Sequence, residues 1–362
     1  MPCDLDYIER ALFLAAQGRG RTSPNPMVGA VIVSPDGVIV GQGFHARAGR
    51  AHAEVRALDM AGPRARGATL YCTLEPCVHV GRTGPCAPRI VEAGIRRVVV
   101  SIADPNPLVA GRGLAYLREH GIAVEVGPGA AAAARLNQAF FTVMREGRPF
   151  VVLKAAASLD GCIAEAPGCR TRLTSEAANR HAHLLRAEVD AIGVGSGTVL
   201  ADDPLLTVRG VYRERPLTRV VFDRRLRTPP SARVLSTLNL GPVMIITTAH
   251  SADARAAQRR ALEARGAIVE PARSESLRAA LEVLAARDIC SLLLEGGAAI
   301  HAAAWDEQLV DLVRLYVAPV ALGGGGLRFL AGRRFASTAL LDRRVEPIGP
   351  DVLIEGYVHR VD

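Results

Sequence analysis

The sequence predicts an α/β protein with two layered domains. Three observations lead to this prediction. Strand-like apolar runs alternate with helical patterns along the chain, and a polar break containing Gly and Pro interrupts them at 145–149. The chain also has 362 residues with 49% hydrophobic content, which is enough for two buried cores. We place the boundary at the break, giving domains of residues 1–146 and 147–362.

The first domain is expected to begin with a helix at 7–20, whose apolar spacing is helical and which ends in glycine. Residues 27–44 are typical of two strands around the Asp36-Gly37 turn. The remaining elements alternate between helix and strand. They are a helix from Ala53, a strand at 68–74, a helix opening near Pro85, a strand at 96–102, a helix near 111–119, a strand near 122–126 and a helix through 130–144.

The second domain repeats this alternation. The expected strands are 150–159, 189–195, 219–223, 243–248, 267–271, 290–297 and 312–319, and the clearest helices are 251–266 and 276–287. No G-x-G-x-x-G follows a strand, so a dinucleotide bound here would not use the Rossmann fingerprint.

Composition excludes several classes of protein. The net charge of +8 is spread along the chain and aromatic residues make up only 4%, so the basic, ring-lined groove of a single-strand binder is not expected. Scattered arginines fit a phosphorylated small molecule better. No apolar run is long enough to cross a bilayer, and the acidic start is unlike a secretory signal. We therefore expect a cytoplasmic homo-oligomer with no nucleic-acid or membrane partner.

A zinc site is indicated by His52, Cys77 and Cys86. His52 and Glu54 form an H-x-E at an expected helix start, and the stretch "EPC" follows on the next loop. In zinc-dependent base deaminases one histidine and two cysteines hold the metal and leave a fourth position for water, while a glutamate moves the proton. We assign Glu54 that role. His79 would close the open position, so we place it beside the pocket rather than on the metal.

Two further features of the sequence, the other cysteines and a single lysine, indicate a function less specifically than the zinc motif does. The other cysteines show no ligand pattern, and Cys72 is expected to be a core thiol on its strand. Lys154 is the only lysine among 44 basic residues, although arginine-rich codon usage would also account for that.

Several motifs together identify a family. The stretches "TSPNPMVGAVIV", "HAEVRAL", "TLEPCVHVGRTGPC" and "ADPNPLVAGRG" resemble the deaminase half of the bifunctional riboflavin-biosynthesis deaminase–reductases. The stretches "RPFVVLKAAASLDG", "GTVLADDPLLTVR" and "LLLEGGAAIHAA" resemble its reductase half. The resemblance implies a cytidine-deaminase-like three-layer domain followed by a dihydrofolate-reductase-like domain. It also implies zinc-dependent deamination of 2,5-diamino-6-ribosylamino-4(3H)-pyrimidinone 5′-phosphate, followed by NADPH-dependent reduction of the ribosyl group.

The resemblance also implies the residues of each site. Substrate contacts are expected from Asn25, His45, Asn106, Lys154, Arg186, Leu206, Arg209 and Glu295. NADPH contacts are expected from Ala156, Thr198, Asp202, Gly297, Ala298, Ala299, Ile300, His301, Ala302 and Ala303.

One departure from the family concerns the reductase half. Where the family usually has G-E-S-x-W-I-T, this chain has arginine at 170 and 172 in place of the serine and the tryptophan. Two alternatives to the bifunctional enzyme therefore stand beside it. One is a deaminase whose C-terminal domain has lost reductase activity, and the other is a nucleic-acid-editing deaminase.

Overall fold

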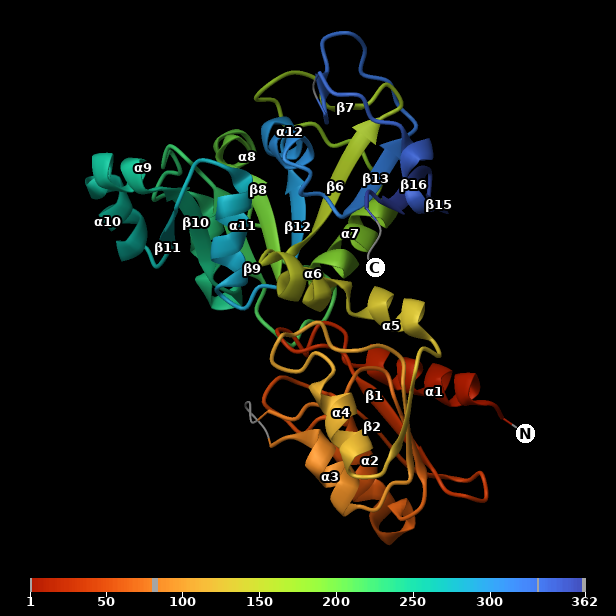
Figure 1. Cartoon of the computed structure of the whole chain (residues 1–362). Coiled ribbons are helices and arrows are strands. Elements are labelled where there is room, and N and C mark those ends of the chain that lie inside the picture. Colours follow the sequence, from red (N-terminus) through yellow and green to blue (C-terminus); the bar gives the residue numbers. More distant parts are fainter. Residues whose placement is uncertain (1, 80–83, 331, 360–362) are drawn as a thin grey trace. The chain divides into compact units, whose positions relative to one another are not determined.

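The computed structural model describes residues 2–79, 84–330 and 332–359, and the chain forms two compact units (Figure 1). The first unit ends at Gly147 and the second begins at Arg148. Each unit has its own sheet and its own buried core.

The first unit is a five-stranded sheet in the order β2-β1-β3-β4-β5. The strands are β1 (Gly29–Val33), β2 (Ile39–Phe44), β3 (Thr69–Cys72), β4 (Arg97–Val100) and β5 (Ala123–Val126). Strand β1 pairs with β2 and β3 in antiparallel fashion, whereas β3, β4 and β5 are parallel. The predicted hairpin at 27–44 is therefore confirmed.

Helices cover both faces of this sheet. They are α1 (Asp4–Ala16), α2 (Ala53–Ala61), α3 (Cys86–Glu92), α4 (Arg112–Glu119), α5 (Ala130–Leu136) and α6 (Gln138–Glu146), with a 3-10 turn at Gly62–Ala65. Because side chains alternate along a strand, Val31 and Val33 pack with α1, while Ala30 and Ile32 pack with α2 and the other helices of that face. The result is a three-layer domain, as expected.

The predicted single helix through 130–144 is wrong. The structure contains α5 and α6, separated at Asn137, whose φ is −107°. The Asn137 side chain is buried, accepts a hydrogen bond from the Met27 N–H (2.7 Å) and donates one to the Met27 carbonyl oxygen (2.9 Å). This pairing with a distant backbone segment overrides local helix propensity.

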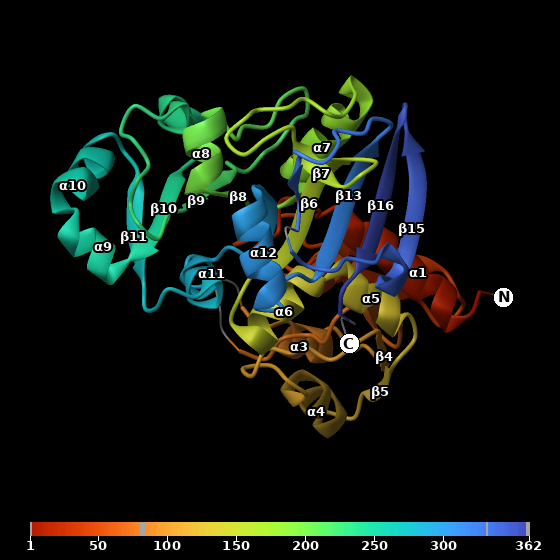
Figure 2. The same cartoon turned by 90° about the horizontal axis from the view of Figure 1, so that it is seen from above.

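The second unit is a nine-stranded sheet in the order β11-β10-β9-β8-β12-β6-β13-β16-β15. Its strands are β6 (Phe150–Ser158), β8 (Ala191–Gly195), β9 (Thr218–Phe222), β10 (Val243–Thr248), β11 (Ile268–Ala272), β12 (Ser291–Gly296), β13 (Leu312–Ala318), β15 (Leu341–Ile348) and β16 (Asp351–Tyr357). All pairs are parallel except β13–β16 and β16–β15, and these three strands lie side by side in Figure 2. A small separate sheet joins β7 (Cys162–Ala164) to β14 (Leu327–Arg328).

The helices of this unit are α7 (Glu176–Glu188), α8 (Ser196–Asp202), α9 (Ala249–Ala254), α10 (Ala256–Ala264), α11 (Leu277–Ala285) and α12 (Ala298–Asp306), with short 3-10 turns at Arg233–Leu240 and Ser337–Ala339. The helix expected at 251–266 is divided at Arg255, whose φ of −117° is not helical. The antiparallel pair β15 and β16 was not predicted, because β15 is mostly exposed and lacks a hydrophobic pattern. Within the described residues, no helix is both long and apolar enough to cross a membrane.

Candidate active sites

The three predicted metal ligands meet in the first unit. His52 is the N-cap residue of α2, Cys77 follows β3, and Cys86 is the first residue of α3. The His52 Nδ1 atom lies 3.6 Å from the Cys77 sulfur and 3.3 Å from the Cys86 sulfur, and the three ligand atoms all lie within 4.8 Å of one another. These separations suit three ligands of one tetrahedral zinc ion, with metal–ligand bonds of about 2.0–2.3 Å.

The electrostatics of this cluster also suit a cation. A hydrogen bond from the Cys86 thiol, aided by the imidazole of His52, holds the pKa of Cys77 well below its usual range. The same contact raises the pKa of Cys86, because two thiolates this close repel each other. A divalent cation would stabilise both thiolates, so the donor set fits zinc.

Glu54 lies on the first turn of α2, two residues after His52. Its side chain is buried, and this burial raises the pKa of Glu54 to about 7. The Oε2 atom is enclosed and has no hydrogen-bond partner among the described residues. An enclosed carboxylate oxygen with an unused acceptor is suited to binding a water molecule and taking its proton.

Asn25 and His45 form a polar wall beside His52. The Asn25 amide donates to His45 Nε2 (3.2 Å), which leaves His45 Nδ1 to donate to the Ala51 carbonyl oxygen (3.4 Å). Burial lowers the pKa of His45, in agreement with a neutral ring that accepts at Nε2. The His45 and His52 rings meet edge to face, with centroids 5.2 Å apart.

His79 is not part of the group of possible metal ligands found in the described part of the chain. Its Nδ1 atom is buried and has no partner among the residues described. Residues 80–83, the middle of the expected insert between Cys77 and Cys86, lie outside the described residues. Cys72 is fully buried on β3, and its thiol faces the Val99 carbonyl oxygen at 3.9 Å.

A cavity of about 530 Å³ in the second unit brings together seven of the fifteen residues expected at the reductase site. Its lining includes Ala156, Arg186, Thr198, Asp202, Leu206, Arg209 and Glu295. Leu206 has a φ of +54°, a conformation that is uncommon for a non-glycine residue and typical of functional sites.

Charged side chains form a network at this cavity. Arg186 binds Glu295 with two bonds, at 2.6 and 2.7 Å, and donates a third to the Thr207 carbonyl oxygen at 2.8 Å. The Lys154 ammonium lies 4.0 Å from Glu295 and 5.6 Å from the centre of the Tyr316 ring. Burial opposes ionisation of Glu295, but the charges of Arg186 and Lys154 lower its pKa to about 2. Arg186 thereby orients Glu295 with two of its five N–H donors and uses a third on Thr207.

His183, which was not predicted, lies one turn before Arg186 on α7. Its Nδ1 atom accepts a hydrogen bond from the Arg209 N–H at 3.2 Å. Burial, together with the charges of Arg186 and Arg209, lowers the pKa of His183 to about 4, so the ring is neutral. The sequence signal that could have identified His183 is its three-residue spacing from Arg186, which places both residues on one face of a helix.

The two unusual arginines line the same cavity. Arg170 and Arg172 are among its lining residues. Burial raises the pKa of Asp202, and the nearby charge of Arg170 opposes that rise. The Arg172 side chain is 70% exposed and lies 3.8 Å from Glu176.

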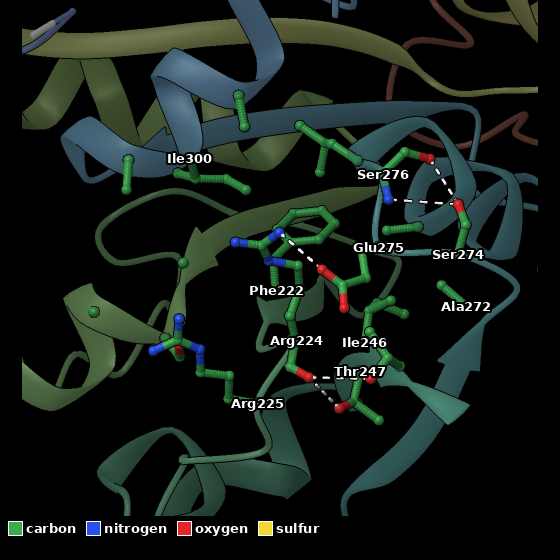
Figure 3. A pocket seen from close by; sticks show the side chains of 18 of the residues that line it. Phe222, Arg224, Arg225, Ile246, Thr247, Ala272, Ser274, Glu275, Ser276 and Ile300 are labelled. Carbon is green, nitrogen blue, oxygen red and sulfur yellow. Dashed lines mark hydrogen bonds and ion pairs between the residues drawn. The ribbon is translucent and has the colours of Figure 1, made fainter. Parts of the chain in front are cut away.

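A second cavity of about 290 Å³ lies at the carboxyl ends of β8 to β11 (Figure 3). Its interior is apolar, with Phe222, Ile246 and Ile300, while its rim carries arginines at 224, 225 and 227. Figure 3 shows Arg224 reaching toward Glu275, from which it is separated by 3.6 Å. The first turn of α8 contributes to both cavities, since Ser196 and Gly197 line this one and Thr198 lines the other.

Not all of the residues expected to contact NADPH face these cavities. Ala299, Ile300 and Ala303 line the second cavity. His301 and Ala302 lie on the opposite, buried side of α12, and His301 Nε2 lies 3.3 Å from the Leu294 carbonyl oxygen. Neither residue lines either cavity, and their expected contact with the cofactor stays a prediction. Gly297 and Ala298 form the start of α12 and line neither cavity.

Comparison with known proteins identifies a family for each half of the chain. Residues 149–354 match the family described as the RibD C-terminal domain, and residues 1–102 match the cytidine and deoxycytidylate deaminase zinc-binding region. The riboflavin biosynthesis protein RibD of Aquifex aeolicus is 41% identical over 357 residues, with 97% of each chain covered. The RibD protein of Escherichia coli is 42% identical over 364 residues, with 96% of this chain and 97% of the relative covered.

Solved structures show the same likeness. A RibD structure from Acinetobacter baumannii is 37% identical, has a TM-score of 0.86 and covers 99% of both chains. A diaminohydroxyphosphoribosylaminopyrimidine deaminase/5-amino-6-(5-phosphoribosylamino)uracil reductase from Thermotoga maritima is 33% identical, has a TM-score of 0.83 and covers 98% of both chains.

Proposed function

The chain belongs to the RibD family, the bifunctional deaminase–reductases of riboflavin biosynthesis, and from this premise we propose which residues carry out each reaction. The enzyme is a zinc-dependent pyrimidine deaminase joined to an NADPH-dependent reductase of the dihydrofolate-reductase-like fold. It deaminates 2,5-diamino-6-ribosylamino-4(3H)-pyrimidinone 5′-phosphate and then reduces the ribosyl group to ribityl. Residues 1–147 form the proposed deaminase domain, and the reductase domain follows from 148.

In the deaminase domain, His52, Cys77 and Cys86 are the proposed zinc ligands. Bound zinc supplies the Lewis acidity that activates water for attack on the ring carbon bearing the amine. Glu54 takes the proton from that water at its free Oε2 atom and passes it to the departing ammonia. Asn25 and His45 bind the pyrimidine beside the metal, and Asn106 contributes from the loop after β4.

In the reductase domain, the cavity of about 530 Å³ is the proposed site of the ribosyl phosphate and the nicotinamide. NADPH supplies the hydride. Glu295 lines it, and the Lys154 ammonium lies 4.0 Å from the Glu295 carboxylate. In this proposal the ammonium donates to the opened ribose while Arg186 holds the carboxylate still. Arg209, whose backbone is held by His183, is placed to bind the phosphate.

The second cavity is the proposed site for the adenosine part of NADPH. Its apolar interior fits a purine ring, and its rim of arginines fits the 2′-phosphate that distinguishes NADPH from NADH. The dinucleotide would cross the start of α8, which lines both cavities. No acidic side chain other than Glu275 and Glu307 lines the second cavity, and Glu307 is engaged by the N–H groups of Leu277 and Arg278.

Removing two rim arginines should change the cofactor preference. We expect the double variant Arg224→Ala/Arg225→Ala to raise the KM for NADPH by about tenfold or more, since charge-assisted contacts to a phosphate are lost. The KM for NADH should stay within about twofold, because NADH lacks the 2′-phosphate. Steady-state reduction of the deaminated intermediate with each cofactor measures both values.

The exposed Arg260 of α10 provides a matched control, and Arg260→Ala should leave both KM values unchanged. An equal rise for NADPH and NADH in the double variant would mean that the arginines do not recognise the 2′-phosphate.

The observation that supports the bifunctional proposal is the presence in one chain of the His52, Cys77 and Cys86 cluster and of a chemically different, charged cavity in the second unit. Product analysis with the diaminopyrimidine substrate tests it. Without NADPH the deaminated intermediate should accumulate with one ammonia released per turnover, and with NADPH it should be converted to the ribityl product. Accumulation of unreduced intermediate at saturating NADPH would instead support a deaminase whose C-terminal domain has lost its activity.

We place the enzyme in the cytoplasm, where reducing conditions keep the two cysteine ligands available as thiolates. The homo-oligomeric state and the absence of a nucleic-acid partner stay predictions, which sedimentation and filter binding with RNA or single-stranded DNA would check.

A further inference from the structure

Glu75 has a buried carboxylate whose acceptor positions are filled by backbone N–H groups. It lies two residues before Cys77 and is only 3% exposed. Its Oε1 atom accepts from the N–H groups of Gly113 (2.8 Å) and Leu114 (3.2 Å), in the first turn of α4. A carboxylate at a helix N-terminus satisfies N–H groups that have no partner within the helix and interacts favourably with the helix dipole.

The other oxygen of Glu75 closes a loop. Its Oε2 atom accepts from the N–H groups of Asp104 (3.1 Å) and Gly111 (3.0 Å), which are the two ends of a 104–111 loop within the segment that joins β4 to α4. The four bonds use all of the roughly four acceptor positions of a carboxylate. One buried side chain therefore fixes both ends of the 104–111 loop and the start of the helix that follows.

Within this loop, Asn106 is held by a chain of hydrogen bonds that begins at Glu75. The Asp104 carboxylate accepts from the Asn106 N–H at 2.8 Å, and the Asn106 side-chain oxygen accepts from the Leu108 N–H at 3.0 Å. The oxygen of the Asn106 amide is therefore fixed. Its Nδ2 group makes no hydrogen bond to the part of the chain that the structure describes, so it remains available for a ligand.

The position of Gly113 provides independent evidence for this arrangement. A Cβ atom at Gly113 would lie 2.0 Å from the Pro76 carbonyl oxygen and 3.1 Å from the Glu75 side chain. Because no side chain fits there, α4 contacts the backbone segment that leads directly into Cys77. The loop that carries Asn106 and the loop that carries Cys77 are thus joined by close backbone packing as well as by the Glu75 carboxylate.

We propose that Glu75 is a positioning residue of the deaminase, which sets the Asn106 amide relative to the metal ligands without touching the substrate. The inference rests on the proposed function, in which Asn106 binds the pyrimidine. A glutamine at position 75 has the same shape, but its NH₂ group cannot accept a hydrogen bond. It would face N–H donors at one of the two oxygen positions and release part of the loop.

A double-mutant cycle in the full-length enzyme tests this role. We expect Glu75→Gln to raise the KM for the diaminopyrimidine by about tenfold or more, with kcat lowered less than about threefold and zinc still at about one per chain. Asn106→Ala should raise the same KM. If Glu75 acts through Asn106, the double variant should show a KM within about twofold of that of Asn106→Ala alone.

The exposed Glu119 at the end of α4 supplies the matched control, and Glu119→Gln should leave KM and kcat unchanged. Asp104→Ala is the second variant if Glu75→Gln does not fold. It removes the carboxylate that holds the Asn106 N–H and keeps the backbone N–H that binds Glu75. It should give the same selective rise in KM and the same lack of additivity.

The outcomes separate this inference from the proposed function. If Asn106→Ala raises the KM and the effects of the two changes multiply in the double variant, the role of Glu75 is refuted and the proposed function is not. Zinc loss in Glu75→Gln, or a fall in its kcat at constant KM, would refute the same role. An unchanged KM in Asn106→Ala would refute the substrate contact of Asn106 and, with it, the reason for the positioning role.

Discussion

Glu54→Gln is expected to lower the deamination rate by a factor of about 10² to 10⁴, the usual contribution of a general acid–base residue. Glutamine preserves the size of the buried side chain, but it cannot take a proton at the position of the unpartnered Oε2 atom. Zinc should remain at about one per chain, because the three proposed ligands are unchanged. Ammonia release and elemental analysis of the purified variant measure the two effects.

The same variant contains its own control. Reduction of supplied deaminated intermediate should be unaffected, because Glu54 belongs to the first unit and the reductase residues belong to the second. Glu92→Gln, at an exposed position on α3, should leave deamination unchanged. A loss smaller than about tenfold in Glu54→Gln would argue against the proton-transfer role.

Cys86→Ser is expected to remove zinc and, with it, deamination. Serine keeps the shape of the first residue of α3, but its hydroxyl is a poor zinc ligand, and two remaining ligands do not make a stable zinc site. Metal content should fall from about one zinc per chain to near zero, with deamination at background and reduction retained. Cys77→Ser should behave in the same way.

His79→Ala is the matched control for the zinc variants, because His79 lies near the ligand loop and outside the three-residue cluster. It should keep its metal. Zinc loss in His79→Ala together with retention in Cys86→Ser would mean that the ligand set has been misassigned.

The zinc cluster and the layer order of the first unit were predictable because they depend on local spacing. An H-x-E at a helix start, a P-C after a strand and a cysteine at the next helix start place three ligands at the same edge of a sheet. The alternation of apolar residues in β1 likewise gives the two covered faces directly.

What the sequence did not reveal depends on contacts between distant segments. Asn137 ends α5 by pairing with Met27, which lies 110 positions earlier in the chain. Arg186 stays a predicted substrate contact, but its pairing with Glu295, 109 positions away, was not foreseen. Glu75 carries no charge pattern that would distinguish it, since its partners are backbone N–H groups. Such partners leave no signature in residue type, so only the folded arrangement identifies these roles.

The enclosure of Lys154 has a consequence for the chemical modification of this enzyme. It is the only lysine of the chain, and its side chain is 16% exposed and lies 4.0 Å from Glu295, which lines the reductase cavity. Acetyl donors and succinimidyl esters acylate amines and spare guanidinium groups. The arginine side chains on the surface therefore keep their positive charges when such reagents are applied. Amine-directed reagents would therefore leave the guanidinium charges intact, and the one side-chain amine that they could modify is the largely enclosed Lys154.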